Sequence, residues 1–120
     1  MNRVSAIHHV NIGTRDRERT REWYQRVFDA EVKAHPRLLE LYLGGAELHF
    51  NETPEPTYAQ VNHFALEIAD WDGMMAHLAA LDIPFDEGRG PQTRDYDGHH
   101  FAYIRDPDGN LIELVHHPAQ

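Results

Sequence analysis

The 120-residue chain contains ten histidines and no cysteine, so any metal or acid–base chemistry must come from imidazoles, carboxylates and tyrosines. Among these residues, His9, His63 and Glu113 are the strongest candidates for a metal site. Two neutral imidazoles and one carboxylate bind a divalent first-row metal and leave coordination positions open for substrate, oxygen or water. These ligand types alone leave iron(II), manganese(II), nickel(II) and zinc(II) as alternatives.

The two halves of the chain repeat one another, and this repeat indicates how the candidate residues are positioned. A shift of 54 positions places residues 9–12 (HVNI) over residues 63–66 (HFAL), and it places Asp16 over Asp70. His9 and His63 therefore occupy equivalent places in the two copies. A histidine alone is more often exposed or bonded to the backbone than a ligand, but this equivalence favours a shared role.

Each copy has the pattern of a strand, a helix and a hairpin. Thr14 or Asp16 is predicted to cap the first helix, and Asp70 or Asp72 the second. Hairpin turns are predicted at residues 44–45 and 106–109. The apolar residues at helical spacing are Trp23, Tyr24, Val27 and Phe28 in the first copy and Met74, Met75, Leu78 and Leu81 in the second.

These elements predict an α+β fold of two βαβββ modules, whose sheets form one curved mixed surface with the helices outside. The chain is expected to be a single domain over residues 1–120. The first module is predicted at about residues 4–51, the linker at 52–58 and the second module at about 59–116.

Strand alternation predicts which residues line the surface away from the helices, because side chains two apart share a face. Val10 and Ile12 are expected to pack under the first helix. His9 and Asn11 then point to the opposite face. By the same alternation, this opposite face collects His63, Glu113, Glu47, His49 and Tyr103.

Composition excludes several functional classes. The net charge of −9 repels phosphate backbones and anionic lipid headgroups, which disfavours nucleic acid as a partner. No apolar run reaches the roughly 20 residues needed to cross a bilayer. The first residues lack the apolar core of a secretory signal, so we expect a cytoplasmic protein. The other histidines that we expect to be exposed or at chain ends are His8, His35, His77, His116 and His117.

Three ordered segments resemble the vicinal oxygen chelate superfamily, which includes glyoxalase I, fosfomycin and bleomycin resistance proteins and extradiol dioxygenases. These segments are residues 7–24, residues 63–66 and residues 101–114. The resemblance implies paired βαβββ modules, a homodimer, a small-molecule substrate, and a divalent metal held by His9, His63 and Glu113.

Extradiol dioxygenases of this superfamily resemble the chain in two spacings. His49 lies 14 residues before His63, and Tyr103 lies ten residues before Glu113. The resemblance implies that His49 is an acid–base residue and that Tyr103 donates a hydrogen bond to a substrate oxygen, with iron(II) or manganese(II) as the metal. A further histidine expected before the penultimate strand is replaced around Arg94, where His99 or His100 could substitute for it.

Glyoxalase I is the main alternative, since residues 46–51 resemble the strand that supplies its fourth ligand. In that case Glu47 is the catalytic base, and nickel(II) or zinc(II) is the metal. The repeat leaves both residues open. Matching Glu47 to Glu113 favours Glu47, whereas matching the turn glycines pairs His49 with Glu113. A metal-free, drug-binding protein of the bleomycin-resistance type is a third alternative, which the intact ligand set disfavours.

Overall fold

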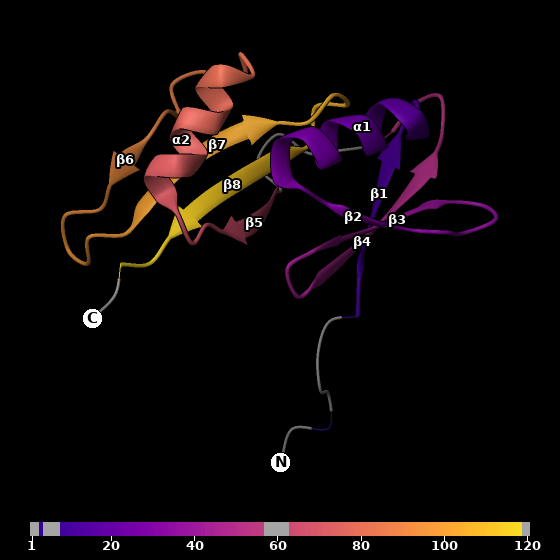
Figure 1. Ribbon diagram of the computed structural model, residues 1–120, viewed down its shortest axis with the longest axis horizontal. Coiled ribbons are helices and arrows are strands. Elements are labelled where there is room, and N and C mark those ends of the chain that lie inside the picture. Colours follow the sequence, from indigo (N-terminus) through magenta and orange to yellow (C-terminus); the bar gives the residue numbers. More distant parts are fainter. Residues whose placement is uncertain (1–2, 4–7, 57–62, 119–120) are drawn as a thin grey trace. The chain divides into compact units, whose positions relative to one another are not determined.

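The computed structural model describes residue 3, residues 8–56 and residues 63–118 (Figure 1). Contacts between backbone segments divide the chain into two units, Met1–Thr57 and Tyr58–Gln120. Each unit has the element order β, α, β, β, β within its described residues, as the repeat predicted.

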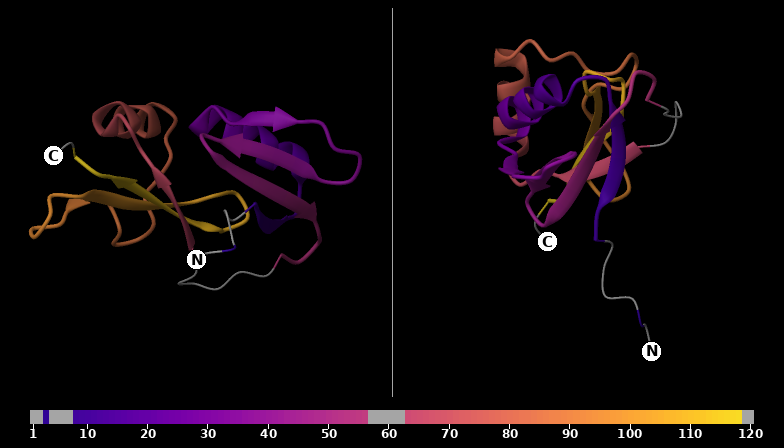
Figure 2. Two further views of the ribbon diagram at one scale, coloured as in Figure 1. Left: turned by 90° about the horizontal axis from the view of Figure 1, so that it is seen from below. Right: turned by 90° about the vertical axis from the view of Figure 1, so that its right-hand side faces the viewer.

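The first unit contains β1 (Val10–Thr14), α1 (Arg17–Phe28), β2 (Glu31–Lys33), β3 (Leu39–Leu43) and β4 (Ala46–Glu52). Its strands form a four-stranded mixed sheet in the order β1-β4-β3-β2. The β1 and β4 strands are parallel, and the other neighbours are antiparallel. In Figures 1 and 2, α1 lies against one face of this sheet.

The second unit contains β5 (His63–Glu67), α2 (Trp71–Ala80), β6 (Gln92–Thr93), β7 (His100–Arg105) and β8 (Leu111–His116). Its sheet has the order β5-β8-β7-β6, with β5 parallel to β8 and the other neighbours antiparallel. Each strand therefore has a counterpart at the same place in the other sheet. The prediction of two βαβββ modules is confirmed.

Both helices begin at the aspartate that the repeat aligns. The carboxylate of Asp16 accepts a hydrogen bond from the backbone N–H of Arg19 at 3.1 Å, and that of Asp70 accepts one from Gly73 at 3.0 Å. These bonds satisfy backbone donors that a helix start leaves without a partner. The other candidate cap of α1, Thr14, is buried instead.

The two long hairpins turn where the sequence predicted. Gly44 has a φ of 58° between β3 and β4, and Gly109 has a φ of 91° between β7 and β8. This left-handed region favours glycine because it has no Cβ. In the second turn, the carboxylate of Asp106 also accepts hydrogen bonds from the backbone N–H groups of Asp108 and Asn110, both at 2.9 Å.

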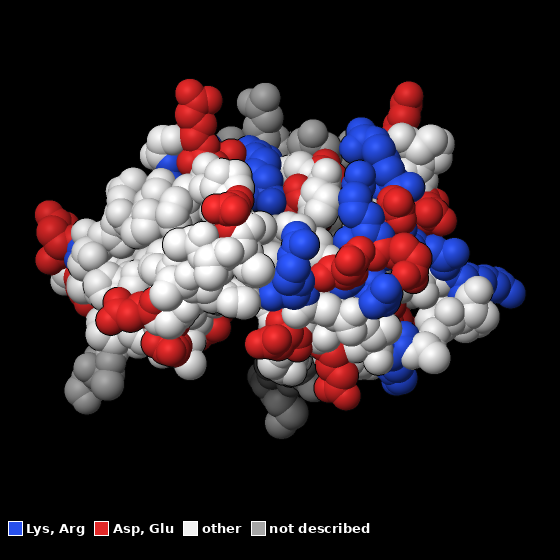
Figure 3. Space-filling view, turned by 45° about the horizontal axis from the view of Figure 1, so that its top comes forward, with Lys and Arg blue, Asp and Glu red and all other residues white. Residues whose placement is uncertain are grey.

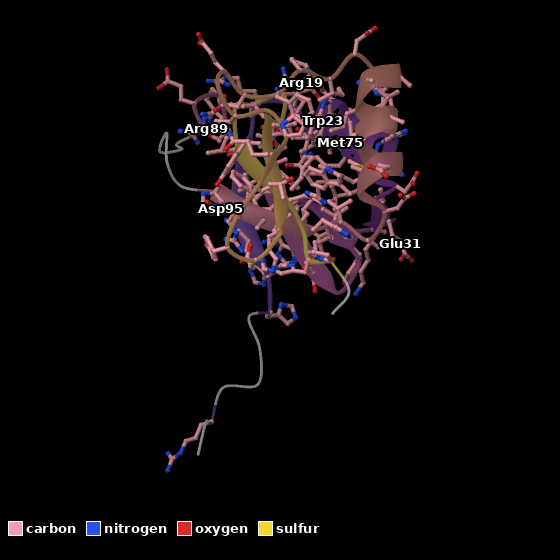
Figure 4. The ribbon with its side chains drawn as sticks, turned by 90° about the vertical axis from the view of Figure 1, so that its left-hand side faces the viewer. Arg19, Trp23, Glu31, Met75, Arg89 and Asp95 are labelled. Carbon is pink, nitrogen blue, oxygen red and sulfur yellow. The ribbon has the colours of Figure 1, made fainter. Side chains whose placement is uncertain are left out.

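Each core lies between a helix and its sheet. In the first unit the rings of Tyr24 and Phe50 lie 5.0 Å apart and both side chains are buried. Trp23, labelled in Figure 4, is buried beside Tyr24. The prediction that Val10 packs under the helix was wrong, since Val10 is 41% exposed. It begins β1, an edge strand of its sheet, where fewer neighbours cover it.

The core of the second unit consists of Leu78 from α2 and the inward residues of β7 and β8, among them Ile104, Ile112 and Leu114, all fully or nearly fully buried. The outer surfaces of the two helices differ. Charged side chains crowd the surface over α1, whereas the surface over α2 is mostly uncharged (Figure 3). Within residues 8–56 and 63–118, neither helix is long and apolar enough to span a membrane.

Replacing Asp70 by alanine should lower the free energy of unfolding by about 1 kcal/mol, because the Gly73 N–H loses its acceptor. Asp70→Asn should keep most of the stability, since the amide oxygen can also accept this bond. Urea unfolding followed by circular dichroism measures the change. Asp72→Ala is the matched control inside the first turn and should cost about 0.3 kcal/mol. An equal loss in both alanine variants would contradict Asp70 as the cap.

Candidate functional site

In the first unit, a group of polar side chains lies on the sheet face opposite α1. Leu39 and Leu41 point into the core, which turns Glu40 to the other face. The burial of Leu48 and Phe50 similarly turns Glu47 and His49 to that face, as the alternation predicted.

The side chains of Glu40, Glu47 and His49 meet on this face. His49 Nε2 lies 2.8 Å from Glu47 Oε1 and 3.5 Å from Glu40 Oε1. Glu40 and His49 are direct partners across β3 and β4. All three side chains are only 12–15% exposed. The imidazole of His49 is therefore held between two carboxylates in a partly dry environment.

Hydrogen bonding to His49 lowers the pKa of Glu47, against the opposing effect of burial, and the charge of His8 acts in the same direction as His49. The Glu47 carboxylate is thus ionised and accepts a proton-bearing nitrogen. Because an ionised carboxylate can only accept, His49 Nε2 carries the hydrogen in this contact. The arrangement defines the tautomer and the orientation of the His49 ring.

Two more histidines adjoin this group. The His9 ring stacks on that of His49, with centroids 3.9 Å apart and planes 12° apart. His8 Nε2 lies 3.8 Å from Glu47 Oε2. His8 is exposed, as expected, but it does contact the site. The name "first-unit cluster" is used below for His8, His9, Glu40, Glu47 and His49.

Glu40, Glu47 and His49 have the donor set of a cation site. One ligand atom from each lies within 4.8 Å of the others, and within the described ranges this is the one such group of three. Two carboxylates and an imidazole suit a divalent metal. The sequence analysis missed Glu40, although the alternation of Leu39, Glu40 and Leu41 gave the signal. What it lacked was the pairing of Glu40 with His49.

In the second unit, His63 and Glu113 meet on the sheet face opposite α2. His63 Nε2 lies 3.2 Å from Glu113 Oε1, joining the adjacent strands β5 and β8. The side chains are 34% and 22% exposed, so the pair is accessible to a ligand. Burial of Ile112 and Leu114 on the opposite face directs Glu113 toward His63.

Tyr103 completes the second-unit pair. It lies opposite Glu113 across β7 and β8, and its ring is edge-on to His63 with centroids 5.5 Å apart. Burial raises the pKa of Tyr103, and the negative charge of Glu113 raises it further. The phenol is therefore protonated at neutral pH and can donate a hydrogen bond.

The residues that could replace a further histidine also lie in this unit. The Arg94 guanidinium pairs with Asp97, with nitrogen–oxygen distances of 2.6 and 3.1 Å, and it contacts His99. His100 instead stacks on Trp71, with centroids 5.5 Å apart, at the helix side of the sheet. His99, not His100, is thus the histidine that lies beside Arg94.

The strand register distinguishes the two ways of aligning the repeats. Asn11 pairs with His49, and Ala65 pairs with Glu113. Since the 54-residue shift aligns Asn11 with Ala65, His49 is the counterpart of Glu113. The structure brings His9, Glu47 and His49 together in the first unit, and His63, Tyr103 and Glu113 together in the second.

Known proteins share this sequence pattern and this fold. The model of the glyoxalase/bleomycin resistance protein/dioxygenase superfamily matches residues 6–114. A trivalent organoarsenical cleaving enzyme from Bacillus sp. (strain MD1) is 31% identical over 114 residues, which cover 90% of this chain and 71% of that enzyme.

Similar solved structures include the fosfomycin resistance protein FosX from Listeria monocytogenes, with a TM-score of 0.82, 20% identity and coverage of 96% and 95% of the two chains. A lactoylglutathione lyase from Agrobacterium tumefaciens has a TM-score of 0.73, 23% identity and coverage of 96% of each chain. At these identities, the structures establish a common fold. With the match over residues 6–114, we conclude that the chain belongs to the glyoxalase/bleomycin resistance protein/dioxygenase superfamily.

Proposed function

We propose that this protein is a metal-dependent enzyme that acts on a small substrate with two neighbouring oxygens. His9, His63 and Glu113 would hold the metal. The observation that carries this proposal is the 3.2 Å contact between His63 and Glu113 beside a protonated Tyr103. An accessible imidazole and carboxylate in contact fit a divalent cation, since both offer lone pairs to it. When bound, such a cation would hold both substrate oxygens in one coordination sphere as a Lewis acid.

The reaction that we favour is ring cleavage of a catechol-like substrate, as in extradiol dioxygenases, with iron(II) or manganese(II). His49 would accept a substrate hydroxyl proton and return a proton later, a role that suits imidazole near neutral pH. Glu47 and Glu40 would orient its ring for this transfer. Tyr103 would donate its hydrogen bond to a substrate oxygen.

The organoarsenical-cleaving relative suggests a different substrate, but the composition of this chain argues against it. Trivalent arsenic is a soft centre that binds thiolates strongly, and soft ligands are what such centres select. This chain contains no cysteine. Its candidate site residues offer imidazole, carboxylate and phenol, which suit oxygen-bearing organic substrates.

Glyoxalase-like isomerisation with Glu47 as the base, and with nickel(II) or zinc(II), is the alternative that the experiment must separate. Abstracting a carbon-bound proton needs a strong base. The hydrogen bond from His49 lowers the pKa of Glu47 and so weakens it as a base. The strand register also makes His49, not Glu47, the counterpart of Glu113. Both observations favour His49 as the acid–base residue.

Anaerobic purification, elemental analysis and assay with catechols under air test the proposal. We expect about one divalent metal per site and a visible absorbance from ring-fission product. Activity on the methylglyoxal–glutathione hemithioacetal with nickel(II) or zinc(II), without activity on catechols, would establish the glyoxalase alternative. Absence of bound metal after reconstitution would favour a metal-free binding protein and would refute the proposal.

Exchanging the candidate residues one by one should separate metal binding from proton transfer. His49→Ala should lower turnover about 10²- to 10⁴-fold, the usual contribution of a general acid–base residue, while sparing metal content. Glu113→Ala and His63→Ala should instead lose the metal. Elemental analysis and steady-state kinetics measure both effects. Loss of the metal from His49→Ala would show that His49 is a ligand.

Tyr103 should titrate above the ordinary tyrosine pKa of about 10, because burial and Glu113 both disfavour its phenolate. Glu113→Gln should lower this pKa by removing the negative charge. Since the folded protein holds this proton more tightly, its contribution to stability should be lost as the pH rises through that value. Tyrosinate absorbance in a pH titration measures the pKa, and Tyr103→Phe assigns the signal. An unchanged titration in Glu113→Gln would refute the coupling.

A further inference from the structure

We propose that the substrate of this site carries a carboxylate and that Arg89 binds it. This inference rests on the proposed function, since it concerns the substrate of the same metal site. It assigns the substrate to the class of small acids with two vicinal oxygens, and it assigns to Arg89 the choice between such acids and their uncharged analogues.

The backbone fixes Arg89 next to Tyr103. Arg89 lies between α2 and β6 and is labelled in Figure 4. Its carbonyl accepts a hydrogen bond from the N–H of Tyr103 at 3.0 Å, and the N–H of Asp86 donates to the Tyr103 carbonyl at 2.8 Å. The Arg89 guanidinium carbon lies 5.3 Å from the centre of the Tyr103 ring. Arg89 is therefore beside the residue that also adjoins His63 and Glu113.

The positive charge of Arg89 is only partly neutralised. The Asp86 carboxylate is shared by two arginines, with Arg105 Nε at 2.9 Å and Arg89 Nε at 3.5 Å. Arg105 is also held by the carbonyl of Gly109 at 2.8 Å. In this group of one aspartate and two arginines, one positive charge is in excess. The Arg89 side chain is 41% exposed, so its guanidinium is open to a ligand.

Arg94 on the same unit shows the contrasting arrangement. Its guanidinium forms a two-point ion pair with Asp97, at 2.6 and 3.1 Å, and this pairing raises the pKa of Arg94. Arg94 is thus occupied by its own carboxylate. Among the arginines described in the second unit, Arg89 is the one whose carboxylate partner is shared and whose contact with it is long.

This charge distribution favours an anionic substrate. A planar guanidinium binds a carboxylate through two parallel hydrogen bonds, which gives both affinity and orientation. A divalent metal at His63 and Glu113 would add further positive charge on the same sheet face. A neutral catechol would use the metal alone, whereas a catechol that bears a carboxylate would use the metal and Arg89 together.

Binding of two matched probes tests this inference. Catechol and 3,4-dihydroxybenzoate are titrated calorimetrically, without oxygen, into the full chain loaded with manganese(II) or iron(II). The acid should bind more tightly than catechol. Arg89→Met should weaken binding of the acid about 10- to 100-fold, the range for one charged hydrogen-bonding pair, and should change catechol binding about twofold at most. Arg89→Lys should lie between, because it keeps the charge without the planar fork.

The controls separate failure of this inference from failure of the proposed function. Arg26→Met removes the same charge from the exposed last turn of α1 and should leave both affinities unchanged. Arg89→Lys provides the measurement if Arg89→Met does not fold. Equal binding of both probes, with the same ratio in every variant, would refute the role of Arg89 and leave the metal site standing. Failure of the wild-type protein to bind either probe would refute both proposals.

Discussion

The alternation of side chains along β4 and β8 is the constraint on which the candidate site depends. Leu48 and Phe50 are buried under α1, and Ile112 and Leu114 are buried under α2. Hydrophobic burial thus fixes the face that each strand turns to its helix, and a shift of one residue would reverse it. The candidate residues of these two strands need no stabilising force of their own to face away from the helix.

The sequence predicted local features well because each follows from a local rule. The caps at Asp16 and Asp70 and the turn at Gly44 depend on a few neighbouring residues. It did not predict that Glu40 contacts His49, because alternation gives the face of a residue but not the strand beside it. The exposure of Val10 was missed for a similar reason, since edge position depends on the order of strands.

The candidate metal ligands illustrate the same limit on local rules. Alternation and the repeat indicated the faces of His63 and Glu113, and the register of β5 with β8 brings them into contact. His9 belongs to the first unit, where it stacks on His49. Joining His9 to the other two ligands requires contact between surfaces far apart in the sequence. No short pattern of residues encodes such a contact, so the complete ligand set is a proposal drawn from the family.

The two imidazole–carboxylate contacts differ in a way that assigns them different roles. A ring nitrogen cannot donate a proton to a carboxylate and give its lone pair to a metal at once. His49 Nε2 is held by two carboxylates and its side chain is 13% exposed, so a metal would have to displace both contacts in a sheltered place. His63 Nε2 has the longer contact with Glu113 and a side chain that is 34% exposed. Metal exchanges for the shared proton more readily there, which favours His63 as a ligand and His49 as a proton carrier.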